Sequence, residues 1–147
     1  MKAITRILAA CVAGALVAAA AHAAEWTEDY SAALARAKKE HKLLLLNFTG
    51  SDWCVWCKRT DQEVFSTKEF GAFADKRLVL VTVDFPKARE LSKAVVDQNA
   101  ALQEKYGVEG YPTIVVLDSN EKVVLRQEGY KEGGPDAFIA QLPKPQT

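Results

Sequence analysis

The sequence predicts an α/β fold in which helices cover both faces of a mixed central sheet. Two patterns in the 147 residues predict it: short continuous apolar runs separated by longer segments of helical periodicity, and a hairpin pattern near the end. Continuous apolar runs are typical of strands that are buried on both faces. Because strands and helices alternate before the hairpin, the sheet should contain both parallel and antiparallel strands. The chain shows no internal repeat, and its length fits one domain with a substantial core.

The first half of the pattern contains one helix, one buried strand and a second helix. A helix is expected at residues 26–41, where Thr27 can cap the start and apolar residues recur at helical spacing. Residues 42–48 form a continuous apolar run, which indicates a strand. A loop at residues 49–52 then leads to a helix from about residue 54 to residue 64.

The second half adds three strands and two helices. The strands are expected at residues 78–83, 113–117 and 123–127, and the helices at residues 88–106 and 136–142. Gly107 follows the longer helix at the position where a left-handed cap favours glycine. Turn-forming residues at 118–121 join the last two strands as a hairpin.

Composition and charge exclude several classes of protein. The 19 Lys and Arg residues balance 19 Asp and Glu residues, whereas a nucleic-acid-binding protein normally carries a basic excess. A hydrophobic fraction of 49% is too high for a disordered chain. Three cysteines are too few for a miniprotein held together by disulfides, and two histidines are too few for most metal centres.

The N-terminal segment has the pattern of a cleavable signal peptide. Lys2 and Arg6 are followed by an uncharged, alanine-rich run over residues 7–21 and then by a small-residue cleavage motif. The run is shorter than the ~20 residues that a membrane-spanning helix needs, which disfavours an uncleaved anchor. Residues 1–23 are therefore expected to be removed, leaving a domain at residues 24–147 that acts in the periplasm or is secreted.

Removal of this leader changes the cysteine count. Cys11 lies inside the leader, and its lipidation would be the alternative, but the apolar residues 7–10 before it are too few for a normal hydrophobic region. Cys54 and Cys57 then remain, with His41 as the one histidine. An exported compartment permits a disulfide between them.

The two remaining cysteines lie in the run W-C-V-W-C-K at residues 53–58. Residues three apart on a helix share one face, so both sulfurs can meet in a disulfide. Cys54 would lie at the helix N-terminus, where free backbone N–H groups and the helix dipole stabilise a thiolate. A thiolate is the attacking species in disulfide exchange, and a neighbouring thiol can resolve the mixed disulfide. The run therefore predicts redox chemistry.

Two other interpretations of the pair remain open. A purely structural disulfide between Cys54 and Cys57 would close a very small loop and would constrain the unfolded chain little. A zinc or copper site would need further ligands, and His41 is the one other candidate unless two chains share the ion.

Three separated motifs resemble the thioredoxin superfamily, and especially its exported members with a W-C-x-W-C-K active site. They are the run at residues 53–58, Tyr111-Pro112-Thr113 before a strand, and Gly129 near the last helix, and the similarity covers residues 42–142. The resemblance implies a thioredoxin-like three-layer α/β/α sandwich. It also implies a cis peptide bond before Pro112, which would pack beside the cysteines, and a backbone there that pairs with an extended client peptide.

The same resemblance implies a division of roles among the site residues. Cys54 would attack a client disulfide, Cys57 would resolve the mixed disulfide, and Pro112 would orient the client. The residues expected to bind the client are Trp53, Trp56, Tyr111 and Thr113. No cofactor or metal is required, the partners are disulfide-containing or thiol proteins, and a net reductase would draw electrons from a membrane thiol carrier.

The chain departs from the thioredoxins where they carry a buried acid on the strand before the cysteines. The matching residue is Asn47, which cannot take a proton, so Glu63 and Asp52 are the candidates for that role. No histidine lies between the cysteines, and Asp52 would oppose a thiolate that Lys58 would favour. This balance favours a reductase or isomerase over a strong oxidase.

The sequence therefore predicts an exported thiol–disulfide oxidoreductase that reduces or isomerises protein disulfides. A hypothesis from another class is a binding or chaperone module whose disulfide is seldom turned over. A metal carrier that uses both thiolates is the third hypothesis.

Overall fold

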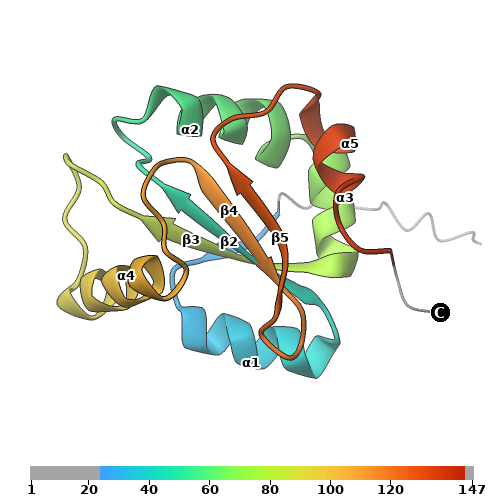
Figure 1. Cartoon of the computed structure of the whole chain (residues 1–147), viewed down its shortest axis with the longest axis horizontal. Coiled ribbons are helices and arrows are strands. Elements are labelled where there is room, and N and C mark those ends of the chain that lie inside the picture. Colours follow the sequence, from blue (N-terminus) through green and yellow to red (C-terminus); the bar gives the residue numbers. More distant parts are fainter. Residues whose placement is uncertain (1–23, 145–147) are drawn as a thin grey trace, which may run out of the picture.

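The computed structural model describes residues 24–144, so the expected leader at residues 1–23 lies outside the described residues. Strands and helices alternate along the chain, as the apolar runs predict (Figure 1). In chain order the elements are β1 (Trp26–Thr27), α1 (Tyr30–Glu40), β2 (Leu43–Thr49), α2 (Val55–Thr60), the π-helix η1 (Asp61–Phe65), α3 (Lys68–Arg77), β3 (Leu78–Asp84), α4 (Lys93–Lys105), β4 (Thr113–Leu117), β5 (Val123–Glu128) and α5 (Gly134–Ile139).

The five strands form one mixed sheet in the order β1-β3-β2-β4-β5. β1 and β2 run parallel to β3, whereas β4 runs antiparallel to both β2 and β5. The predicted mixture of parallel and antiparallel pairs is confirmed. Parallel pairing aligns Thr49 at the end of β2 with Asp84 at the end of β3, so the loops that follow these strands emerge side by side.

Alternate residues of the central strands pack into two separate cores, because side chains of a strand point to opposite faces of the sheet. On β2, Leu44, Leu46 and Phe48 face one core, whereas Leu45 faces the other. α1 and α4 cover the first face, and α3 and α5 cover the second (Figure 1). The three-layer α/β/α sandwich is confirmed.

The start of the domain differs from the predicted helix at residues 26–41. Trp26 and Thr27 form the short edge strand β1, and α1 begins at Tyr30. Asp29 caps it in place of Thr27, since the Asp29 carboxylate accepts the backbone N–H of Ala32 at 2.9 Å. The prediction that Thr27 caps the helix was wrong, because the Thr27 hydroxyl accepts the N–H of Asp29, which precedes the first residue of the helix.

Two other helices also differ from the predictions. The helix expected at residues 88–106 begins only at Lys93, because the Ser92 hydroxyl caps it by accepting the N–H of Val95 at 3.3 Å. α3 has no counterpart among the predicted elements. It is capped by Thr67 and buries Phe70 in the core.

The helix expected from residue 54 to residue 64 is one continuous helical segment with a change of winding. It is α-helical as α2 and becomes the π-helix η1 from Asp61 onward. Single-turn π-helices are rare and occur frequently at functional sites. The final helix, expected at residues 136–142, lies slightly earlier, at Gly134–Ile139.

Candidate active site

The two cysteines lie where the loop after β2 enters α2. Cys54 is the N-cap residue, its Sγ accepts the backbone N–H of Cys57 at 3.1 Å, and the two residues form a disulfide with their Cα atoms 5.2 Å apart. Both are buried, with exposed fractions of 6% and 5%. Their neighbours Trp53, Val55 and Trp56 are among the most exposed large apolar residues. The buried disulfide is thus flanked by exposed apolar side chains.

The loop before the cysteines is held by a buried carboxylate at the end of β3. Asp84 is 1% exposed, and it accepts the backbone N–H of Ser51 at 2.9 Å and the Ser51 hydroxyl at 2.6 Å. Arg89 donates to the same carboxylate at 3.0 Å, which offsets the cost of burying its charge. The Gly50 carbonyl accepts the N–H of Cys54 at 2.8 Å and completes the turn into α2.

Asp52 ties the same loop to the segment that follows β3. Its carboxylate accepts the backbone N–H groups of Lys87 and Ala88, and these bonds hold the pKa of Asp52 below its ordinary value. Lys58 donates its Nζ to the Asp52 backbone carbonyl at 2.9 Å. Asp52 and Lys58, whose opposite charges were expected to affect the Cys54 thiolate, therefore both hold the active-site loop in place.

Trp53 forms the centre of an aromatic cluster on one side of the disulfide. Its indole Nε1 donates to the Phe85 carbonyl at 2.8 Å, and its ring meets the Tyr111 ring edge-on with centroids 5.9 Å apart. The Lys87 ammonium lies 4.2 Å from the indole centroid, within cation–π range. We call Trp53, Phe85, Lys87 and Tyr111 the Trp53 cluster.

The peptide bond between Tyr111 and Pro112 is cis, as the resemblance implies, and Tyr111 places this loop against Trp53. The Pro112 carbonyl accepts the N–H of Gly129 at 2.8 Å. Burial raises the pKa of Tyr111, although its hydroxyl accepts a hydrogen bond from Gln103. Thr113 is buried and donates its hydroxyl to the Gly110 carbonyl at 2.7 Å, so its side chain stabilises the loop.

A second aromatic cluster, which the sequence patterns did not indicate, lies on the other side. Trp56 stacks on Tyr130 with centroids 5.6 Å apart and planes inclined by 22°. The Arg59 guanidinium lies 4.6 Å from the Tyr130 centroid. Glu63 accepts hydrogen bonds from the Tyr130 hydroxyl and from Arg59, and the bond from the hydroxyl is the main reason why the pKa of Tyr130 is raised. We call Trp56, Arg59, Glu63 and Tyr130 the Trp56 cluster.

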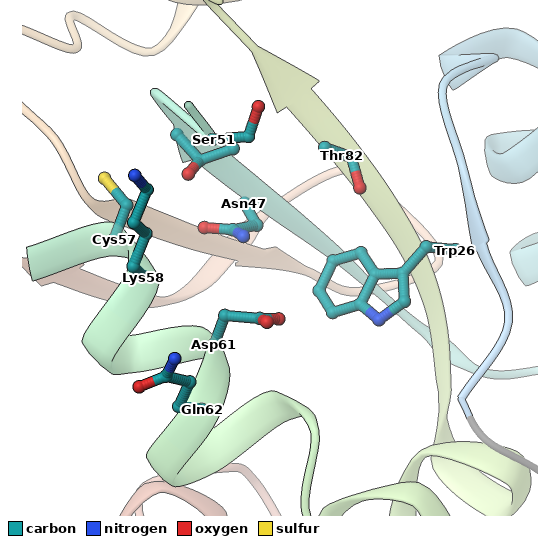
Figure 2. Close-up of a pocket in the computed structure, with 9 residues that line it drawn as sticks. Trp26, Asn47, Ser51, Cys57, Lys58, Asp61, Gln62 and Thr82 are labelled. Carbon is teal, nitrogen blue, oxygen red and sulfur yellow. The ribbon is translucent and has the colours of Figure 1, made fainter. Parts of the chain in front are cut away.

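A cavity of about 340 Å³ lies between α2 and the sheet, with Cys57 in its lining. Figure 2 shows the side chains that line it. Asn47 from β2 and Asp61 from the helix project into this space. The Asn47 Oδ1 is buried and accepts no hydrogen bond from any of residues 24–144. The cavity is lined by Trp26, Asn47, Thr49, Ser51, Cys57, Lys58, Asp61, Gln62 and Thr82.

Neither proton acceptor suggested by the sequence lines this cavity. Glu63 belongs to the Trp56 cluster, and the carboxylate of Asp52 is bound to the segment after β3. Asp61, which the sequence patterns did not single out, lines it instead. Its position four residues after Cys57 is the signal that could have identified it, because residues four apart share a helix face.

Residues 24–144 contain neither a metal-ligand cluster nor a membrane-spanning helix. No three His, Cys, Asp or Glu residues in this range come together as they would around a metal ion. In the same range no helix has the length and apolar character needed to cross a membrane. His41 caps the C-terminal end of α1 with φ 54°.

The thioredoxin-like domain family matches residues 30–144 of this chain. A Chlamydia pneumoniae protein described as disulfide bond reductase DsbH is 36% identical over 118 residues, which cover 80% of this chain and 70% of that protein. Thioredoxin-related protein DsbJ of the same organism is 32% identical over 101 residues, which cover 69% of this chain but only 29% of that protein.

Among solved structures, one described as DsbH oxidoreductase has a TM-score of 0.76 and 34% sequence identity, and the match covers 82% of each chain. The family match at residues 30–144 includes β2 and β3, whose ends lead into the loops at the site. It also includes the disulfide-bonded pair Cys54 and Cys57. The chain therefore belongs to the thioredoxin-like family, and it is a thiol–disulfide oxidoreductase.

Proposed function

We propose that this chain reduces protein disulfides in the periplasm, with Cys54 as the attacking thiol and Cys57 as the resolving thiol. The observation that carries the proposal is the Cys54 sulfur at the N-cap of α2, where it accepts the Cys57 N–H. Such a hydrogen bond stabilises a thiolate, and the exposed side chains of Trp53 and Trp56 on either side of it offer a client an apolar surface. Similarity to a disulfide bond reductase supports the reducing direction.

The reaction consists of two exchanges that together move two electrons to the client. The Cys54 thiolate attacks one sulfur of the client disulfide, the client S–S bond breaks, and the second client sulfur leaves as a thiolate that takes up a proton. Cys57 then loses its proton and attacks the Cys54 sulfur. The Cys54–Cys57 disulfide forms, and the first client sulfur leaves with the electron pair and is protonated.

The client peptide, in this proposal, lies between the Trp53 cluster and the Trp56 cluster. Tyr111 packs on Trp53 and Tyr130 stacks on Trp56, so both indole rings are held in place before a client binds. Aromatic rings that are already ordered lose little conformational entropy on binding. The backbone at Pro112 would pair with the extended client, and Thr113 would hold that loop in position.

Location and electron supply follow from the leader and from the chemistry. The signal-peptide pattern at residues 1–23 supports export to the periplasm. Each turnover leaves Cys54 and Cys57 oxidised, so continued reduction requires a donor of lower reduction potential. We assign that role to a membrane thiol carrier that passes electrons from the cytosolic side.

Reduction of insulin disulfides by dithiothreitol, followed by the turbidity of the released chains, tests this function. The wild-type protein should accelerate the reaction, and Cys54→Ser should reduce the rate to that of dithiothreitol alone. A Cys54→Ser variant that keeps the wild-type rate would refute the mechanism. If the variant binds clients as well as the wild type and the wild type gives no acceleration, the protein is a binding module. Equilibration with glutathione tests the direction, and a potential as oxidising as about −120 mV would contradict a reductase.

A further inference from the structure

We propose that a recess between α4 and the segment after β3 binds an apolar side chain of the client whose disulfide is reduced. This inference rests on the proposed function, because it names the kind of client that the exchange site accepts. The recess has a volume of about 330 Å³. Sites for small ligands have volumes of about 300–1,000 Å³, so the recess is large enough for one side chain.

The walls of the recess are apolar. Phe85, Pro86 and Leu91 line it from the segment after β3, and Val96 and Ala100 line it from α4. Val96 is 49% exposed, although it is a large apolar residue. Apolar side chains that surround a hollow on the surface are typical of a binding site, because an apolar ligand removes them from water.

The polar groups that line the recess already have partners. The Asp84 carboxylate accepts a hydrogen bond from Arg89, which also donates to Glu28. The Asn99 Nδ2 donates to the Asp84 carbonyl at 2.9 Å, and the Asn99 Oδ1 accepts a hydrogen bond from Gln98 at 3.1 Å. A polar group that entered the recess would lose its water without gaining a partner, which is unfavourable. The recess therefore favours an aliphatic or aromatic side chain.

The segment after β3 is fixed at its start, so the recess exists before a client binds. The Phe85 N–H donates to the Thr49 carbonyl at 2.8 Å. Two residues later, the Asp52 carboxylate accepts the N–H groups of Lys87 and Ala88. A site that is formed in advance binds its ligand without the entropy cost of ordering a loop.

Phe85 connects the recess with the exchange site. Its carbonyl accepts the Trp53 indole N–H at 2.8 Å, and its ring centroid lies 5.1 Å from that of Tyr111. The segment after β3 leaves the sheet at the same end as the loop into α2 (Figure 1). Trp53 directly precedes Cys54, the residue to which the client becomes bonded.

This continuity identifies the occupant as the client. A client chain that extends from Cys54 across the Trp53 cluster reaches the recess after a few residues, because an extended chain advances about 3.3 Å per residue. The client is held at Cys54 in each exchange, so its neighbouring residues are present at the recess at high effective concentration. A second copy of the chain has no such tether.

Peptides that contain one disulfide and a flanking segment of serine and alanine test this proposal. A single leucine is moved through positions about two to six residues from the cysteine, and glutamine replaces it in a parallel series. Dithiothreitol recycles the protein, and chromatography follows the reduction of each peptide above the rate with dithiothreitol alone. At the best position, leucine should raise kcat/KM about tenfold over the peptide without leucine, whereas glutamine should give no gain.

Two variants with matched controls show whether the recess causes the leucine preference. Ala100→Phe fills the recess and should reduce the preference to less than about twofold, whereas Ala101→Phe places the same ring on the neighbouring exposed residue and should keep it. Val96→Ser removes part of a wall and should lower the preference about threefold. Val123→Ser should have no effect, because Val123 is similarly exposed but lies at the other end of the sheet. The peptide without leucine should be reduced at the wild-type rate by all four variants.

Equal rates for the leucine, glutamine and unsubstituted peptides, or a leucine preference that survives both Ala100→Phe and Val96→Ser, would overturn the proposal. Size-exclusion chromatography tests the alternative occupant. If the wild type forms a dimer that Ala100→Phe disrupts, and the leucine preference is unchanged, the recess holds a second copy and the proposal is wrong. A wild-type protein that reduces none of the peptides would instead contradict the proposed function.

Discussion

Replacement of Gly50 by alanine tests whether the active-site loop depends on the indole ring that covers it. A Cβ at Gly50 would lie 2.4 Å, 2.6 Å and 2.7 Å from Cε2, Cζ2 and Nε1 of Trp53. Optimal contacts between carbon atoms are about 3.5–4.0 Å, so the ring has to move. The Trp53 side chain lies on the surface with 41% of it exposed, which allows the ring to swing outward. By moving outward the Trp53 ring avoids the clash, but it loses the contacts that it makes in the wild-type protein.

The cost follows from the contacts that Trp53 would lose. Its hydrogen bond to the Phe85 carbonyl is worth about 1 kcal/mol, and its edge-on contact with Tyr111 is worth about 0.5–1.5 kcal/mol. Gly50→Ala should therefore lower the free energy of unfolding by about 2 kcal/mol. It should also reduce the rate of insulin reduction, because the displaced indole ring would no longer hold the Trp53 cluster together beside Cys54.

Urea unfolding followed by far-ultraviolet circular dichroism measures this change. Gly110→Ala is the matched control, because a Cβ at Gly110 meets nothing within 4 Å, and it should change the free energy of unfolding by less than about 0.5 kcal/mol. In a Trp53→Ala background, Gly50→Ala should have almost no effect. Equal stability of the Gly50→Ala and Gly110→Ala proteins would refute this reasoning.

Three further predictions concern the loop and the core. The backbone N–H groups of Lys87 and Ala88 hold the pKa of Asp52 below 3.8, so the stability they provide is present above that pH and is lost as the pH falls through the folded-state pKa. Asp52→Asn should accordingly lower the urea midpoint at pH 7, and its difference from the wild type should shrink below pH 3.8. Asp84→Ala should cost about 2 kcal/mol in urea unfolding, because the Ser51 N–H, the Ser51 hydroxyl and the Arg89 guanidinium lose their common acceptor, and a loss under 0.5 kcal/mol would contradict the role given to it. Phe70→Ala should cost about 3–5 kcal/mol in the same assay, since the ring is fully buried, and a smaller loss would mean that α3 is loosely packed.

The central strands were predictable because their signal is local. Residues 42–48 and 78–83 are continuous apolar runs, and both form strands with buried residues on each face. The cysteine pair was predictable for the same reason, since a spacing of three on a helix is read directly from adjacent residues. Gly107, with φ 58°, adopts the left-handed conformation that its place after a helix predicts.

Elements that depend on distant partners were not predictable in this way. Trp26 and Thr27 form a strand only because β3, more than fifty residues later, offers an edge for pairing. Residues 88–92 were expected to be helical, but Asp52 binds the backbone at Lys87 and Ala88, Asp84 binds the Arg89 side chain, and the segment is held as a loop. The sequence shows these charges without showing which groups they meet.

The acids near the cysteines show the same limitation within the site. Asp52 and Glu63 are near the cysteines in sequence, yet their carboxylates are bound to the segment after β3 and to Tyr130. The structure instead places Asp61 in one cavity with Asn47 and Cys57. Tyr130 was missed for a related reason, because its partner Trp56 is 74 residues earlier in the chain.

Trapping of the mixed disulfide tests the division of roles between the two cysteines most directly. Reduced Cys57→Ala and Cys54→Ser variants are mixed with a disulfide-bonded peptide, quenched with acid, and analysed by intact mass spectrometry. The mechanism predicts that Cys57→Ala accumulates one covalent peptide adduct on Cys54, whereas Cys57 of Cys54→Ser, which lies within α2 and not at its N-cap, forms almost none. An adduct on Cys57 as abundant as that on Cys54, or no adduct in either variant, would contradict it.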